Sequence, residues 1–132
     1  MGPRFFDTNV LAYLASADTA KADIAQGLLA EGGTVSVQVL NELANVARRK
    51  MGLSWVETES FLAMIRAFVT VEPLTLRTHE LGLALAERHR LSLYDAMIVA
   101  AGLIAGCETL FSEDMSDGFT IARQMTIRNP FA

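Results

Sequence analysis

The stretch that decides the fold is Phe5-Phe6-Asp7-Thr8-Asn9-Val10-Leu11, near the start of the chain. It predicts a short apolar strand ending at Phe6, followed by a carboxylate, two small polar residues and a helix. In open α/β sheets the ligand crevice lies outside the carboxyl ends of the strands. Asp7 therefore stands where a binding or catalytic acid is expected, although an Asp before a helix is also an ordinary N-cap.

Strand and helix patterns alternate along the rest of the chain. Further strands are expected at 34–37, 69–74 and 108–111, with a fifth one possible at 125–127. Helices are expected at 10–15, 20–30, 39–51, from 54 onward, at 78–89 and at 92–106, and Ser54 with Glu57 has capping-box spacing. This alternation predicts parallel strands in a covered α/β sheet. No repeat or linker interrupts it, so one domain is expected over residues 1–132.

Composition excludes several classes of protein. Hydrophobic residues make up 52% of the 132 residues and the mean hydropathy is +0.31, which argues against disorder. The longest small or apolar run, 96–107, is too short to span a bilayer, which takes roughly 20 residues, so no membrane association is expected. The single cysteine, Cys107, excludes an internal disulfide and fits a reducing compartment, so we expect a cytoplasmic protein.

The net charge of −4 has the wrong sign for a protein that attracts nucleic acid by its overall field. The basic residues are bunched, however, at Arg48-Arg49-Lys50 and at Arg88 with Arg90. Local patches of this kind can contact phosphates, and we take Arg48, Arg49 and Lys50 as candidate RNA-binding residues. Taken singly, each bunch is better explained as solvated cations near a helix C-terminus.

Three more acids lie in segments whose neighbours are apolar or small: Glu42, Asp95 and Asp114. Each has an ordinary explanation when taken singly. Glu42 is explained as a solvated helix residue, Asp95 as a residue of a helix cap, and Asp114 as part of a turn. If they gather with Asp7, each pair about 4 Å apart repels by roughly 4 kcal/mol at an effective dielectric constant near 20. The acids must then protonate, separate or bind cations, and oxygen ligands alone select Mg²⁺ or Mn²⁺.

These segments resemble the PIN-domain family, and within it the toxin ribonucleases of VapBC toxin–antitoxin pairs. The resemblance covers nearly the whole chain and rests on 6–11, Asn41-Glu42-Leu43, Leu93-Tyr94-Asp95-Ala96 and Phe111-Ser112-Glu113-Asp114. It implies a three-layer α/β/α sandwich with a central parallel sheet of four to five strands, and hydrolysis of RNA. It also implies a homodimer and a cognate antitoxin. The apolar residues of the helix pair at 39–68 are expected to serve both the core and such an interface.

The resemblance also implies the roles of individual residues. Asp7, Glu42, Asp95 and Asp114 match the acidic ligands of one or two Mg²⁺ or Mn²⁺ ions, with Asp117 as an additional candidate. Thr8, Asn9 and Ser112 match the small polar residues that support them. Two alternatives stay open: a catalytically weak binding module for RNA or a partner peptide, and an aspartyl phosphatase or phosphotransferase. Asn9 disfavours the latter, because the commonest family of that kind has a second Asp there.

Overall fold

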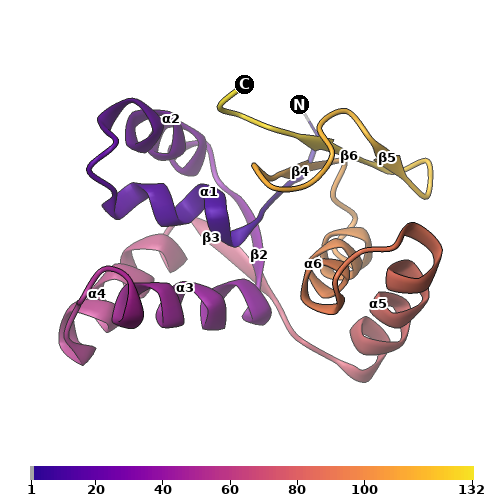
Figure 1. Ribbon diagram of the computed structural model, residues 1–132, viewed down its shortest axis with the longest axis horizontal. Helices are drawn as coiled ribbons and strands as arrows, with labels where there is room; N and C mark the ends of the chain where they lie inside the picture. Colours follow the sequence, from indigo (N-terminus) through magenta and orange to yellow (C-terminus); the bar gives the residue numbers. More distant parts are fainter. Residues whose placement is uncertain (1) are drawn as a thin grey trace.

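The structure is a computed structural model that describes residues 2–132, and its strands form a single six-stranded sheet (Figure 1). The strands are β1 (Arg4–Phe6), β2 (Gly33–Ser36), β3 (Val69–Glu72), β4 (Thr109–Phe111), β5 (Thr120–Ile121) and β6 (Met125–Arg128). Their order is β3-β2-β1-β4-β6-β5, and every pair is parallel except β5 with β6. The predicted parallel α/β sheet is confirmed, and the two-residue strand β5 adds one strand to the number expected.

Six α-helices connect the strands. They are α1 (Thr8–Ala12), α2 (Thr19–Ala30), α3 (Val37–Arg49), α4 (Trp55–Arg66), α5 (Leu76–His89) and α6 (Leu93–Ile104), and a 3₁₀ turn, η1 (Tyr13–Ala15), continues α1. The predicted capping box at the start of α4 is present: Ser54 N donates to Glu57 Oε1 at 2.9 Å, and Glu57 N donates to Ser54 Oγ at 3.0 Å. None of the helices within residues 2–132 has the length and apolar character needed to cross a membrane.

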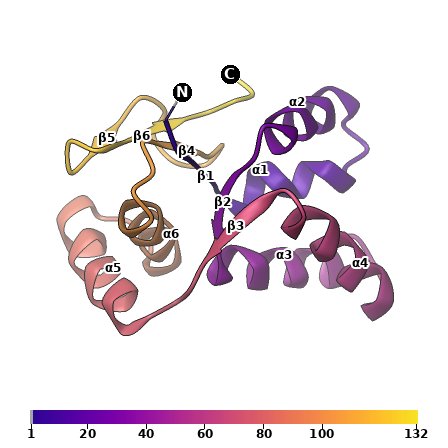
Figure 2. The ribbon, with the colours of Figure 1, turned by 180° about the vertical axis from the view of Figure 1, so that it is seen from behind.

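The helices form two layers, one on each face of the sheet. The chain steps from β1 to β2 to β3 in one direction and then returns from β3 to β4 on the other side of β1. Because crossover connections between parallel strands are right-handed, reversing the direction places the later helices on the opposite face. Figures 1 and 2 accordingly show α5 and α6 on one side and α1 to α4 on the other. This is the expected three-layer sandwich.

The reversal places β1 and β4 side by side at the topological switch point of the sheet. Phe6 pairs with Phe111 in register, and Asp7 N donates to Phe111 O at 2.9 Å. The residues that follow the two strands, Asp7 and Ser112, are therefore neighbours. Ligands of open α/β sheets bind at such a point.

Apolar packing fixes the helices that carry the remaining acids. Helix α6 lies between the sheet and α5, and every residue from 96 to 101 is buried. The apolar residues of α3, α4 and the segment after α4 are only partly in the core: Leu43 and Ile65 are fully buried, while Trp55 and Phe68 are 66% and 48% exposed. The core therefore holds α3 and α6 rigidly against the sheet, and part of the α3–α4 surface stays apolar.

Candidate active site

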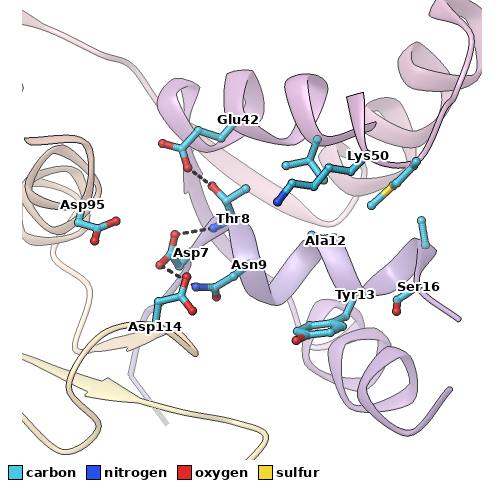
Figure 3. A pocket seen from close by; sticks show the side chains of 13 residues that line it. Asp7, Thr8, Asn9, Ala12, Tyr13, Ser16, Glu42, Lys50, Asp95 and Asp114 are labelled. Carbon is cyan, nitrogen blue, oxygen red and sulfur yellow. Dashed lines mark hydrogen bonds between the residues drawn. The ribbon is translucent and has the colours of Figure 1, made fainter. Parts of the chain in front are cut away.

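A pocket of about 450 Å³ opens at the switch point, and all four predicted acids line it (Figure 3). They belong to four different parts of the fold: Asp7 caps the start of α1, Glu42 lies on α3, Asp95 lies in the first turn of α6, and Asp114 follows β4. Figure 3 shows their side chains approaching a common space from different sides. Acids up to 107 positions apart in the chain thus share one pocket because the sheet order brings their elements together.

Asp7 is the most buried of these acids, with only 4% of its surface exposed. It is the N-cap of α1, and its Oδ1 accepts from Thr8 N at 2.7 Å, so the ordinary capping role is present. Its Oδ2 accepts from Ser112 Oγ at 2.8 Å and from Asn9 Nδ2 at 3.4 Å. The residues predicted to support the site, Thr8, Asn9 and Ser112, therefore all contact this carboxylate directly.

Burial raises the pKa of Asp7 from 3.8 to about 7. In reaching this net pKa value, burial is opposed by the hydrogen bonds from Ser112 and Thr8 and assisted by the negative charges of Asp95 and Glu42. Its role as an N-cap does not explain why Asp7 is buried or why the acids Asp95 and Glu42 lie near it. A cation in the pocket would favour the ionised form of Asp7.

Glu42 is half-buried, and two hydrogen bonds fix its carboxylate. Thr8 Oγ1 donates to Oε1 at 2.7 Å, and Gln38 Nε2 donates to Oε2 at 2.7 Å. Gln38 lies one helical turn earlier on α3, so the helix aims both side chains at the same place. Thr8 therefore connects two acids, since its backbone contacts Asp7 and its side chain contacts Glu42.

Asp95 and Asp114 complete the pocket with fewer constraints. Ser92 caps α6 by accepting from Asp95 N at 3.3 Å, which is the predicted capping role. Burial raises the pKa of the Asp95 carboxyl; Ser92 lowers it by a hydrogen bond, and the charges of Glu42 and Asp114 raise it. Asp114 is exposed, on the loop that leaves β4. The charges of neighbouring acids thus contribute to the raised pKa of both Asp7 and Asp95, after burial.

The donor set of this pocket suits a hard cation, although the side chains are not yet gathered around one point. Among residues 2–132, no group of three or more His, Cys, Asp or Glu side chains is already placed to hold a metal ion. The ion pairs formed by these residues, Arg4–Glu31 and Lys21–Glu113, also leave all four acids without a basic partner. The carboxylates therefore reduce their repulsion by separation and, for Asp7, by a raised pKa. Oxygen donors without His or Cys fit Mg²⁺ or Mn²⁺.

A second network holds the loop that carries Asp114. Asn9 Oδ1 accepts from Glu113 N at 3.1 Å, Tyr13 Oη donates to Glu113 Oε1 at 2.6 Å, and Lys21 Nζ lies 2.6 Å from Glu113 Oε2. The hydrogen bond from Lys21 lowers the pKa of Glu113, with Tyr13 contributing further. Sequence reasoning missed Tyr13, Lys21 and Glu113, and partners 92 and 100 positions apart leave no local pattern that could reveal them.

The remaining predicted residues lie in different places. Lys50 lines the pocket, and Figure 3 shows its side chain extending from the end of α3 toward the acids. Arg48 lies outside the pocket, where it donates to Leu53 O at 2.7 Å and stacks over the Trp55 ring at 4.2 Å. Arg49 lines that same outer surface. Of the basic triplet, only Lys50 is positioned to contact a ligand of the acidic pocket.

Asp117 is also outside the pocket. Its Oδ1 accepts from Asn129 N at 2.9 Å, which ties the loop after β4 to the segment that follows β6. The structure thus gives Asp117 a loop-bracing contact and does not bring it to the other four acids. Its role as a metal ligand stays a prediction.

Fold and pocket together define a class: α/β proteins with a doubly covered parallel sheet and an acid-lined pocket at the switch point. The sequence profile of the PIN-domain family matches residues 4–116, a span that includes all four acids. The chain therefore belongs to the PIN-domain family. No curated protein matches the chain significantly.

Solved structures of toxin proteins share this fold. The Mycobacterium tuberculosis toxin VapC20, described as cleaving the sarcin–ricin loop, is 27% identical; the match covers 84% of this chain and 89% of VapC20, with a TM-score of 0.69. A toxin–antitoxin complex from Klebsiella pneumoniae matches at 21% identity over 96% and 97% of the two chains, with a TM-score of 0.72. DNA-bound VapBC from Salmonella typhimurium matches at 18% identity over 98% and 99%, with a TM-score of 0.64. The last two likenesses show the fold alone.

Proposed function

We propose that this protein is a Mg²⁺- or Mn²⁺-dependent endoribonuclease and the toxin of a type II toxin–antitoxin pair. The observation that carries the proposal is the convergence of Asp7, Glu42, Asp95 and Asp114, from four parts of the fold, on one pocket where none of them has a basic partner among residues 2–132. Membership of the PIN-domain family and the similarity to VapC20, an RNA-cleaving toxin, support the same reaction class.

The four acids would hold the ion or ions. When bound, such an ion would polarise a phosphoryl oxygen and lower the pKa of the attacking water. The protein fixes the position of its ligands: Thr8 and Ser112 hold the Asp7 carboxylate, and Thr8 with Gln38 holds that of Glu42. Such fixed carboxylates avoid the ordering cost that mobile ligands would incur on binding.

Lys50 supplies a positive charge to this otherwise acidic pocket. It extends from α3 on the side of the pocket away from Asp95 (Figure 3). An ammonium group there can contact a phosphate of the bound RNA without displacing the acids. We place Lys50 in substrate binding and give Arg48 and Arg49 no direct contact with the reacting phosphate.

The proposal is tested by incubating purified protein with RNA in Mg²⁺ or Mn²⁺, with and without EDTA. We expect cleavage that leaves 3′-hydroxyl and 5′-phosphate ends, and loss of cleavage in EDTA. Asp7→Asn and Glu42→Gln should abolish cleavage, while Glu87→Gln, an exposed acid on α5, controls for the change in net charge. Wild-type turnover by Asp7→Asn in Mg²⁺ contradicts the assignment.

The products also separate the alternatives, since a phosphotransferase would leave a phosphoenzyme and a binding module would retain intact RNA.

The proposed antitoxin partner and the toxin role are tested by expression in cells. The Klebsiella pneumoniae neighbour is a toxin–antitoxin complex, and the exposed Trp55, at the start of α4, or Phe68, just after its end, could contact such a partner. Expression of this chain alone should arrest growth, and co-expression of a small protein encoded beside it should restore growth. Sedimentation of the purified chain tests the expected homodimer. Unimpaired growth and intact RNA after expression would contradict the toxin role.

A further inference from the structure

The pocket that holds the four acids has a second end, whose lining residues, all within 2–132, include no acid. We call it the apolar end, because it is formed mainly by Ala12, Tyr13, Ala15, Val46 and Met51. Figure 3 shows Ala12 and Tyr13 on the side of the pocket away from Asp95. The whole pocket, about 450 Å³, lies within the range of sites that hold small organic molecules, roughly 300–1,000 Å³. It therefore has room for more than metal ions.

Small side chains keep the apolar end open. The segment of α1 and η1 contributes Ala12 and Ala15, with Ser16 directly after it, and the end of α3 contributes Val46, with Met51 shortly after the helix. The side chains of Ala12, Ala15 and Ser16 are too short to fill the space between the two segments. Val46 and Met51 are only partly buried, so apolar surface stays available to a ligand.

Tyr13 is held so that its ring is the part left for a ligand. Its hydroxyl donates to Glu113 Oε1 at 2.6 Å and accepts from Lys21 Nζ at 3.2 Å. The ring also packs edge-on against Phe131, with 4.9 Å between the ring centroids. Partners from three other segments therefore fix the ring at the wall of the pocket. An aromatic ring that is already fixed loses little conformational freedom when a ligand contacts it.

Lys50 and Ser16 add two polar groups to this part of the pocket. Lys50 extends toward the pocket in Figure 3, and the ion pairs among residues 2–132 do not involve it. Its ammonium group favours an anionic ligand, and the apolar end favours an apolar group attached to that anion. A nucleotide has this combination, because its phosphate is an anion and its base has apolar faces with polar edges.

We propose that the apolar end binds the base of a nucleotide next to the bond that is cleaved. This inference rests on the proposed ribonuclease function and deepens it, because it assigns a base subsite to the substrate. A phosphate that reacts beside the four acids carries a base one sugar away, and the apolar end is the adjoining part of the same pocket. Contact with an aromatic ring tolerates every base, so the subsite should accept purines and pyrimidines.

The first test measures binding without cleavage. Thermal unfolding in Mg²⁺ is followed at increasing concentrations of the 3′- and 5′-monophosphates of adenosine and uridine, and of ribose 5-phosphate, which lacks a base. We expect at least one isomer of each nucleotide to bind about tenfold more tightly than ribose 5-phosphate, which is within the range that stacking gives per base. Equal affinities for the nucleotides and ribose 5-phosphate would overturn the proposal.

The second test fills the apolar end. Ala15→Leu adds bulk at an exposed position that lines the pocket, and Ala17→Leu adds the same bulk at an exposed position outside it. In Ala15→Leu we expect the nucleotide affinity to fall about tenfold and KM for RNA to rise by a similar factor, with no such change in Ala17→Leu. The increase of Tm in Mg²⁺ alone should be the same in both, because neither change touches the acids.

A pair of substitutions at Tyr13 separates the ring from the hydroxyl. Tyr13→Ala should lower the nucleotide affinity about tenfold, and Tyr13→Phe should restore most of it, because the ring is kept. An equal loss in Tyr13→Phe would assign the effect to the contacts of the hydroxyl with Glu113 and Lys21, and the base contact would be refuted.

The outcomes distinguish this inference from the proposed function. If wild-type protein cleaves RNA but nucleotides bind no better than ribose 5-phosphate, the base subsite is wrong and the ribonuclease proposal stands. If wild-type protein cleaves no RNA, the proposed function fails and this inference fails with it. If Ala15→Leu keeps the wild-type KM for RNA but is no longer neutralised by the co-expressed partner, the apolar end binds a protein and not a base.

Discussion

Replacing Asp7 with Asn should stabilise the protein in EDTA at neutral pH. The stabilisation should appear only at pH values at which the wild-type Asp7 carboxyl is ionised. The carboxyl is 4% exposed, and burial raises its pKa to about 7 from 3.8. Asn is nearly isosteric, and its amide oxygen can still accept from Thr8 N. The Ser112 hydroxyl can reverse its direction to accept from the new amide. The variant therefore removes a costly buried charge and keeps the local packing.

The sign and size of the stability difference between wild type and Asp7→Asn follow from proton linkage. A carboxyl whose folded pKa lies above its unfolded pKa binds more protons in the native state, so stability is present at low pH and is lost as pH rises from about 4 to about 7. Raising the pKa from 3.8 to about 7 corresponds to about 4 kcal/mol of unfolding free energy, since a tenfold change in the proton equilibrium is worth about 1.36 kcal/mol. This value is an upper limit for the increase in unfolding free energy that Asp7→Asn produces near pH 8. Near pH 4 the two proteins should be about equally stable.

The assay is urea denaturation followed by circular dichroism, from about pH 4.5 to about pH 8.5 in EDTA. Asp23→Asn, an exposed acid on α2, controls for the change in net charge. Adding Mg²⁺ should stabilise wild-type protein by mass action and should affect Asp7→Asn less. A constant difference in unfolding free energy between wild type and Asp7→Asn at every pH would refute the reasoning, because it would show that Asp7 is ionised throughout or is not buried.

Two further changes test the support of the site and of the sheet. Thr8→Val removes the hydroxyl that donates to Glu42 Oε1 at 2.7 Å. We expect kcat/KM for RNA to fall about 10–100-fold with little change in Tm. An unchanged kcat/KM would show that the function of Glu42 does not depend on this contact. Gly33→Ala should destabilise the fold by about 1–3 kcal/mol in urea, because the new Cβ would lie 2.5 Å from Phe6 Cε2. Gly27→Ala on α2 meets no atom within 4 Å and should stabilise it by about 0.5–1 kcal/mol, so equal effects of the two substitutions would contradict the packing argument.

The sequence could predict features whose cause is local. Helix caps are of this kind: Ser54 with Glu57 forms the expected box, and Ser92 caps α6 as its spacing indicates. The shared edge of Asp7 and Asp114 could also be predicted, because the carboxyl ends of parallel strands meet at one edge of a sheet. No strand order was needed for that inference.

Features that depend on distant partners could not be predicted. The acidic turn 112–118 gives no indication that Asp114 enters the pocket while Asp117 turns away to Asn129. Strand β5 was missed because two residues carry no periodicity, and its turn contains Ala122-Arg123 where Asn-Gly would signal a hairpin. Arg48 was not separated from Lys50 because both belong to one basic run, and the contacts that hold Arg48 away from the pocket, with Leu53 O and the Trp55 ring, come from residues beyond the helix.

The cost of burying Asp7 follows from the fold and not from any single neighbour. Helix α1 begins directly after β1, so its N-cap must lie at the switch point, next to Ser112. The hydrogen bonds from Thr8 and Ser112 offset only part of the desolvation, since the pKa still reaches about 7. Full ionisation at neutral pH therefore requires positive charge close by, and a divalent ion shared with Glu42, Asp95 and Asp114 would supply it. The same energetics would link metal affinity to stability at Asp7, so Asp7→Asn should both stabilise the protein in EDTA and weaken its response to Mg²⁺.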